Sequence, residues 1–230
     1  GDYYAAYMNT AAIDKAGLAP IKPLLDSIAA IQTRTQLATW LGAQTGVLDT
    51  PVPLGIEADY QDPTINRLQT WQGGLGLPDR DYYLKKDDER LAKARAAYVD
   101  YLQTLAKAAG IADPAGSAQR VLALEERLAE VQWDKVSLRD PQKTYNPMTP
   151  AELAQKAPGF DWNAFFTAAS LPGLDKLSAS QPSYLTGAAK LLNVSRLPMP
   201  GPMERLLNAE NESSPNGHPS PEGMEQPPDP

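Results

Sequence analysis

The spacing of apolar residues constrains the fold of this 230-residue chain most, because it follows a helical period almost throughout and changes to alternation once. Between residues 87 and 105 apolar side chains recur every three or four positions, and they do so again between residues 121 and 131. The first stripe comprises Leu91, Ala94, Tyr98, Tyr101, Leu102 and Leu105, and the second comprises Val121, Leu124, Leu128 and Val131. Each stripe predicts one face of an amphipathic helix.

Shorter helices are expected on both sides of this pair. In the N-terminal part the first helix stops at Gly17, the second opens at Pro20 and Pro23, and the third ends before Gly42 or Gly46. Capping residues followed by proline mark two later helix starts. These starts are Asp113-Pro114 and the capping box Thr149-Pro150-Ala151-Glu152, and further helices are expected over residues 162–169 and 182–192.

The period changes at residue 52. Apolar side chains alternate from Val52 to Tyr60, and a second, less regular run extends from Ile65 to Trp71. The Gln61–Thr64 segment between them contains Asp and Pro, which favour a turn. The sequence therefore predicts a mainly α, multi-helix domain with one small antiparallel β-hairpin.

The C-terminal stretch has a different composition. Residues 195–230 contain nine prolines with Gly, Ser, Asn and Glu, and only a weak apolar cluster at Leu206-Leu207. Such a segment cannot bury enough apolar surface to offset the entropy lost on ordering. We expect a helical domain over residues 1–194 and a disordered Pro-rich tail over residues 195–230.

Composition excludes several classes of function. The net charge of −7 argues against sequence-independent binding of nucleic acid. No run approaches the roughly 18 apolar residues of a membrane-spanning helix. Residue 1 is Gly and no signal peptide is recognisable, so a processed product or a fragment is expected.

Metal chemistry is restricted by the residue counts. The chain has no cysteine and one histidine, His218, which stands in the Pro-rich stretch, and the H-E-x-x-H signature of zinc peptidases is absent. A catalytic zinc ion needs three protein ligands around an open position. We therefore interpret His218 as a surface residue and expect no catalytic, cofactor-binding or metal-binding residues in this chain.

The glycine-rich segment from Gln72 to Tyr83 invites comparison with nucleotide-binding loops. The dinucleotide fingerprint would need glycine where Asp79 stands, and Pro78 would fall inside the phosphate turn. A structural interpretation is favoured, in which the glycines allow positive φ or close approach and Pro78 ends the strand. For Arg80, local ion pairing with Asp79 and Asp81 is favoured over a role in ligand binding.

Other candidate groups also have structural explanations. Asp87 and Asp88 precede a helix, where capping accounts for them. Glu125 and Glu126 could serve a glycosidase, but they lie beside an apolar stripe and are interpreted as a solvated face. No G-x-S-x-G serine motif is present. The aromatic residues interpreted as core anchors are Tyr98, Tyr101, Trp133 and Trp162.

Four blocks, taken in order, resemble one family, the neprilysin-like zinc metallopeptidases (neprilysin, endothelin-converting enzyme, bacterial oligopeptidase O). The segment from Gln72 to Leu84 is similar to the family's Q-x-G-L-G-L-P-x-R-D-Y-Y-L motif and is the most specific match. The other blocks are Asp2-Tyr3-Tyr4 with Tyr7-Met8, Trp133 with Arg139-Asp140-Pro141 and Thr144-Tyr145-Asn146, and Gln181-Pro182-Ser183-Tyr184-Leu185. The resemblance covers residues 1–193.

The resemblance implies a truncated, non-catalytic portion of such an enzyme. In the family, two mainly helical domains enclose a cavity, and the zinc ligands and catalytic Glu lie in the C-terminal part, which has no counterpart here. This region would cap the active-site cavity and restrict substrate size, so the chain alone is expected to be inactive. Zinc and short peptide substrates belong to the complete enzyme, and the expected partner is the missing catalytic domain.

Two further expectations follow. The family suggests a periplasmic, extracellular or membrane-anchored location. A chain lacking its partner domain would leave apolar stripes in water, so poor solubility or a molten core is expected. The alternative function is a stand-alone helical protein-interaction module without enzymatic activity.

Overall fold

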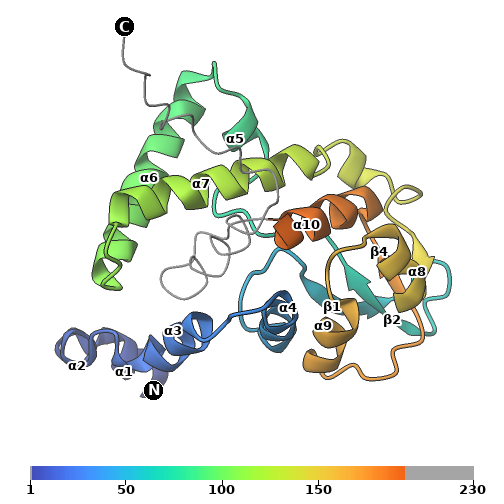
Figure 1. Ribbon diagram of the computed structural model, residues 1–230, viewed down its shortest axis with the longest axis horizontal. Helices are drawn as coiled ribbons and strands as arrows, with labels where there is room; N and C mark the ends of the chain where they lie inside the picture. Colours follow the sequence, from blue (N-terminus) through green and yellow to red (C-terminus); the bar gives the residue numbers. More distant parts are fainter. Residues whose placement is uncertain (1, 195–230) are drawn as a thin grey trace, which may run out of the picture.

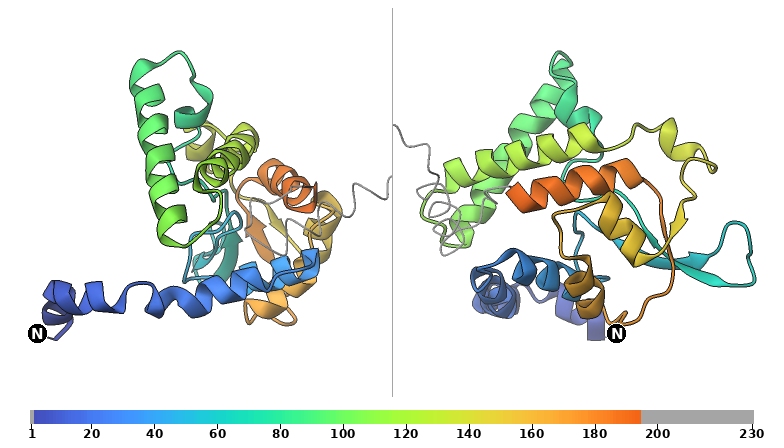
Figure 2. Two further views of the ribbon diagram at one scale, coloured as in Figure 1. Left: turned by 60° about the vertical axis from the view of Figure 1, so that its left-hand side comes forward. Right: turned by 45° about the vertical axis from the view of Figure 1, so that its right-hand side comes forward.

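The computed structural model describes residues 2–194, and the tail predicted over residues 195–230 lies outside them. The described residues begin with four helices. Figure 2 shows that the first three of them extend as an arm from the rest of the molecule. They are α1 (Asp2–Met8), α2 (Thr10–Ala16), α3 (Lys22–Ala29) and α4 (Arg34–Ala43), with a short 3-10 helix at Ala19–Ile21. The single first helix predicted from the sequence is two helices, because the Asn9 side chain accepts a hydrogen bond from Ala12 N and starts α2.

The predicted hairpin is present and forms half of a larger sheet. Strands β1 (Leu54–Ala58) and β2 (Asn66–Thr70) pair antiparallel, with Ile56 opposite Leu68. Two short strands join them, β3 (Pro147–Met148) and β4 (Leu177–Ala179), and the strand order is β1-β2-β4-β3. Strand β4 runs parallel to β2. Strands of two and three residues are too short to show alternation, which explains why the sequence did not predict them.

Six more helices complete the described part of the chain (Figure 1). They are α5 (Asp81–Leu84), α6 (Glu89–Ala108), α7 (Pro114–Val131), α8 (Pro150–Lys156), α9 (Trp162–Ala168) and α10 (Pro182–Val194), with a 3-10 helix at Ser137–Arg139. The predicted helix starts are confirmed: Asp113 caps α7 and Thr149 forms a capping box with Glu152. No helix among residues 2–194 combines the length and apolar character needed to cross a membrane.

One main hydrophobic cluster joins α4, α8, α9, α10 and the sheet. Helices α4 and α9 approach closely at Gly42, where an added Cβ would overlap the carbonyl of Phe165. Trp162, Phe165 and Phe166 pack against one another in the same cluster. The C-terminal part of α7 reaches this cluster through Leu128 and packs beside α10.

Helices α5 and α6 pack against α7, away from the sheet (Figures 1 and 2). The predicted apolar stripe of α6 is partly wrong. Tyr101 is 56% exposed and Leu105 is 47% exposed, whereas Arg95 and Val99 are buried. The buried face is set by α5 and α7, and Arg95 is accommodated because its guanidinium donates to the carbonyls of Tyr82, Lys85 and Lys86 at the end of α5.

Candidate functional site

The described residues do not provide a zinc site. Among residues 2–194 no group of three or more His, Cys, Asp or Glu side chains is placed to hold a metal ion. His218, the chain's one histidine, lies outside the described residues. The donor set in this part of the chain therefore does not fit the three ligands of a catalytic zinc ion.

The most distinctive sequence segment, which begins at Gln72, lies where several elements meet. The Gln72 side chain bonds both backbone groups of Trp133: Oε1 accepts from the amide N at 2.7 Å and Nε2 donates to the carbonyl at 3.2 Å. The backbone N of Gln72 donates to Oε1 of Gln181 at 2.8 Å, just before α10. One glutamine thus links β2 to the ends of two helices that are distant in sequence.

The glycine after Gln72 is fixed in the same way. The carbonyl of Gly73 accepts from Gln132 Nε2 at 3.0 Å and from the Tyr184 hydroxyl at 3.0 Å, and that hydroxyl also lies 2.8 Å from the carbonyl of Pro51. A Cβ on Gly73 would come within 2.6 Å of the Thr50 carbonyl oxygen. The close approach confirms the structural interpretation of these glycines.

Two details of that interpretation are wrong. Pro78 does not end the strand, because β2 stops at Thr70. Arg80 does not pair with its neighbours: Asp79 bonds Lys135 at 2.7 Å and Asp81 bonds Lys85 at 2.8 Å. The Nε of Arg80 instead donates to the carbonyl of Ala129 in α7 at 3.1 Å. The arginine therefore fastens the loop to α7.

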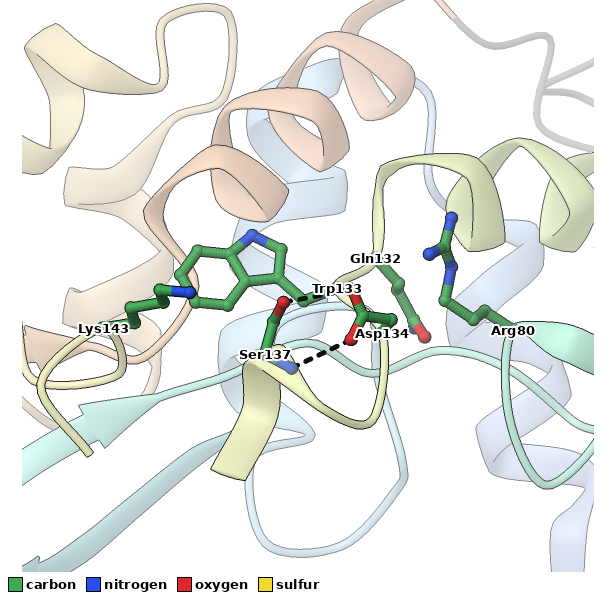
Figure 3. Close-up of a pocket in the computed structure, with 6 residues that line it drawn as sticks. All are labelled: Arg80, Gln132, Trp133, Asp134, Ser137 and Lys143. Atoms are coloured by element: carbon green, nitrogen blue, oxygen red, sulfur yellow. Dashed lines mark hydrogen bonds between the residues drawn. The ribbon is translucent and has the colours of Figure 1, made fainter. Parts of the chain in front are cut away.

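A shallow polar pocket of about 280 Å³ lies beside this junction (Figure 3). Its lining residues are Arg80, Gln132, Trp133, Asp134, Ser137 and Lys143. The Asp134 carboxylate accepts from Ser137 N and Oγ, and the amide of Ser137 is the main cause that lowers its pKa. Arg80 and Lys143 lie at opposite ends of the pocket (Figure 3), so their positive charges do not converge on one ligand atom.

The carboxylates of α7 differ from the solvated face that the sequence predicted. Glu126 pairs with Lys86 near the surface, but Glu125 is only 9% exposed. Its two oxygens accept from the hydroxyls of Tyr83 at 2.8 Å and Tyr98 at 2.9 Å. Burial raises the pKa of Glu125 above its ordinary value, because desolvation disfavours the charged form.

The outcomes for the other candidates are mixed. Asp88 caps α6 by accepting from Leu91 N, as predicted. Trp162 is a core anchor, and Trp133 is half-buried with its indole N–H donating to Ser183 Oγ at 2.7 Å. Tyr101, which is exposed, is not an anchor.

Sequence reasoning missed a buried ion pair at the end of the hairpin. Asp59 is 2% exposed and accepts hydrogen bonds from the Arg67 side chain and, at 2.9 Å, from the Tyr145 hydroxyl. The Arg67 guanidinium holds the pKa of Asp59 far below its usual range. The pair connects β2 to the 140–146 loop. No spacing rule links these positions, because Tyr145 is 86 residues from Asp59.

The arm formed by α1, α2 and α3 has no buried residue. Its exposed large apolar residues are Tyr3, Tyr4, Tyr7, Met8, Ile13, Leu18 and Ile21. A mainly apolar groove of about 770 Å³ separates α3 from the turn after α6, with Leu25 and Ile28 on one wall and Ile111 on the other. Exposed apolar patches of this kind mark interaction surfaces or ligand-binding grooves.

Comparisons with known proteins agree on one family. The model of "Peptidase family M13", for the N-terminal region, matches residues 1–199. Endothelin-converting enzyme 1 of Rattus norvegicus is 29% identical over 205 residues, which cover 85% of this chain and 26% of the relative. The Homo sapiens enzyme is 28% identical over 209 residues, with 84% and 27% covered. The chain thus spans about a quarter of the length of these relatives.

Solved structures give the same result. The zinc metalloprotease Zmp1 of Mycobacterium tuberculosis, in complex with an inhibitor, superposes with a TM-score of 0.78 at 31% identity, covering 91% of this chain and 33% of that one. PepO from Lactobacillus rhamnosis shares the fold, with a TM-score of 0.64 at 21% identity and coverage of 84% and 32%. The chain therefore belongs to peptidase family M13 and corresponds to the N-terminal region of its enzymes.

Proposed function

We propose that this chain is a non-catalytic portion of an M13 zinc peptidase, which caps the active-site cavity and limits the size of the substrate. The observation that carries the proposal is the arm of α1, α2 and α3, which has no buried residue and exposes large apolar side chains. Such an arm gains stability only when another part of the protein covers it. The remaining region of the enzyme is the natural cover, since the chain spans about a quarter of its relatives.

The catalytic zinc and its ligands belong, in this proposal, to the remaining region. The purified 230-residue chain is incubated with zinc and a fluorogenic oligopeptide, and zinc binding is measured by calorimetry. We expect no hydrolysis that a chelator inhibits, and no tight binding of zinc at one ion per chain. One zinc ion bound per folded chain, together with peptide cleavage that a chelator abolishes, would contradict the proposal.

The size-limiting role needs a complete enzyme. In a chimera, residues 1–194 of this chain replace the matched region of M. tuberculosis Zmp1, to which they are 31% identical. We expect the chimera to cleave short peptides and to leave a folded protein substrate intact. A chimera that degrades both substrates equally well would sink the size-limiting role, while leaving the assignment to the family untouched.

A stand-alone interaction module is the second candidate, and the groove beside α3 favours it, because its walls are mainly apolar. Size-exclusion chromatography with light scattering separates the two candidates. A defined complex with another protein supports the module, whereas a monomeric or aggregating chain supports the fragment. We further propose a periplasmic, extracellular or membrane-anchored location for the complete enzyme, which cell fractionation tests.

A further inference from the structure

Helices α5 and α6 form a packing unit of their own with α7. Six buried apolar residues of these helices lie outside the main hydrophobic cluster. They are Tyr83, Leu91, Val99, Ala106, Ala118 and Ala129. Such a small set of apolar contacts is typical of a unit that opens at lower free energy than the rest of a protein. The polar contacts at its centre therefore have a large share in holding it closed.

Glu125 is at that centre. Its Oε2 accepts from Tyr83 of α5 at 2.8 Å, and its Oε1 accepts from Tyr98 of α6 at 2.9 Å. The Tyr83 hydroxyl accepts in turn from Leu77 N at 2.8 Å. One carboxylate thus joins α5, α6, α7 and the Gly76–Leu77 loop.

The donors that reach Glu125 are all neutral. On α5, Asp81 pairs with Lys85, and on α6 the guanidinium of Arg95 is directed to backbone carbonyls. Lys86, which follows α5, pairs with Glu126 of α7, and Tyr101 contacts the ring of Tyr98. A buried carboxylate with neutral donors and no bonded cation among these groups is costly to ionise.

Gly76 shows how tightly the junction is built. A Cβ at this position would overlap the hydroxyl of Tyr98, so the backbone of the loop lies directly against this tyrosine.

We propose that Glu125 is a proton-linked latch, which fastens α5 and α6 to α7 most firmly when its carboxyl group is protonated. A protonated carboxyl both donates and accepts hydrogen bonds, so it can satisfy two tyrosine hydroxyls without a buried charge. The ionised form still accepts both hydrogen bonds, but burying its charge costs desolvation free energy. The packing of this unit then depends on pH, independently of any catalytic site.

The direction of the pH dependence follows from linkage. Burial raises the pKa of Glu125 in the folded state above that in the opened state. The stabilisation is therefore complete below the ordinary carboxyl pKa and is lost as the pH rises through the raised value. Opening of α6 should become easier on going from mildly acidic to neutral solution.

Hydrogen exchange of the α6 amides, residues 89–108, tests the latch in the full chain. Protection is measured between pH 4.5 and 8 and corrected for intrinsic exchange. We expect protection in the wild type to fall with rising pH, and Glu125→Gln, a neutral isostere, to lose this dependence. Glu126→Gln is the matched control, because it removes the neighbouring carboxylate on the same helix, and it should keep the wild-type profile.

A second variant guards against misfolding of the first. Tyr98→Phe removes one hydrogen bond to the ionised carboxylate, so it should move the fall in protection to higher pH. A ¹³C titration of the Glu125 carboxyl should show the same upward shift. The proposal would be contradicted if Glu125→Gln kept the wild-type pH dependence of protection. It would also be contradicted if Tyr98→Phe shifted neither the pH dependence of protection nor the ¹³C titration of Glu125.

Discussion

Individual polar side chains join segments of this chain that lie far apart in the sequence, and local sequence patterns do not predict these contacts. The pairing of Asp59 with Arg67 and Tyr145 is one example, and the Gln72 amide between β2 and Trp133 is another. In the first case a buried carboxylate accepts from Arg67 of the same hairpin and from the distant Tyr145, and in the second a part-buried amide bonds a backbone 61 residues away. These partners remove most of the cost of burial. Each group therefore fixes how separate segments meet.

The first prediction concerns Asp59. Asp59→Asn should lower the midpoint of thermal unfolding at neutral pH, because the Arg67 guanidinium loses its counter-charge in a buried site. The folded-state pKa of Asp59 is lowered, so its stabilisation is present above the ordinary pKa and is lost as the pH falls through the folded value.

The difference between wild type and Asp59→Asn should therefore shrink on acidification, which melts recorded from pH 7 to pH 3 can follow. Asp175→Asn, at an exposed position in a loop, is the control and should melt like the wild type throughout. A difference that stays constant over this pH range would argue against the charge pair.

At the scale of elements, helix ends were the most predictable feature and helix faces the least. The capping box at Thr149 and the Asp113-Pro114 start are local, so the chain itself specifies them. Which face of a helix is buried depends on the neighbours. In α6 the presence of α5 turns Arg95 inward and leaves Tyr101 outside.

The contact between α4 and α9 gives the second prediction. In an isolated helix Gly→Ala stabilises by about 1 kcal/mol. At Gly42 the added methyl group would overlap the Phe165 carbonyl and lie 3.1 Å from the Ala168 Cβ. Gly42→Ala should instead destabilise by about 1–3 kcal/mol, the usual cost of overpacking.

Urea unfolding of wild type and Gly42→Ala measures this difference. The sign of the difference in unfolding free energy decides the outcome. A variant more stable than the wild type would mean that the two helices separate easily and that helix propensity dominates. Gly→Ala at the other close contacts is not a suitable control, because Gly73 and Gly76 are also tightly packed.

At the scale of the whole molecule, the described part of the chain combines a well-packed core with an uncovered arm. The main cluster includes fully buried aromatic residues such as Phe165 and Tyr184. Helices α1 and α2 of the arm contribute no residue to it. The packed core thus lies apart from the exposed apolar side chains of these two helices.

The third prediction follows from this separation. Deleting residues 1–17 should change the free energy of unfolding by less than about 0.5 kcal/mol, as for surface changes that remove no buried contact. It should also reduce binding of a hydrophobic dye, because Tyr3, Tyr4 and Tyr7 are removed. A large loss of stability would show that the arm packs against the core in solution.

Much of the fold could be predicted from the sequence, but few of the contacts around Gln72 and Glu125 could. The helices, the hairpin and the structural role of Gly73 follow from periodicity and glycine chemistry. The parallel pairing of β2 with β4 could not, because it joins Thr70 to Ala179 across more than 100 residues. Glu125 was wrongly interpreted as solvated, because a position beside an apolar stripe is typical of a solvated residue, whereas the tertiary structure buries it.

The sequence by itself determined the starts of α7 and α8, where the hairpin lies and, through the resemblance of its motifs, the peptidase family. These features depend on neighbouring residues or on short motifs. Only the tertiary structure decided that Glu125 and Asp59 are buried, that Arg80 bonds Ala129 and that the arm is left uncovered. The physical reason is that burial and hydrogen-bond partners are set by contacts between segments far apart in the chain, which no local pattern records.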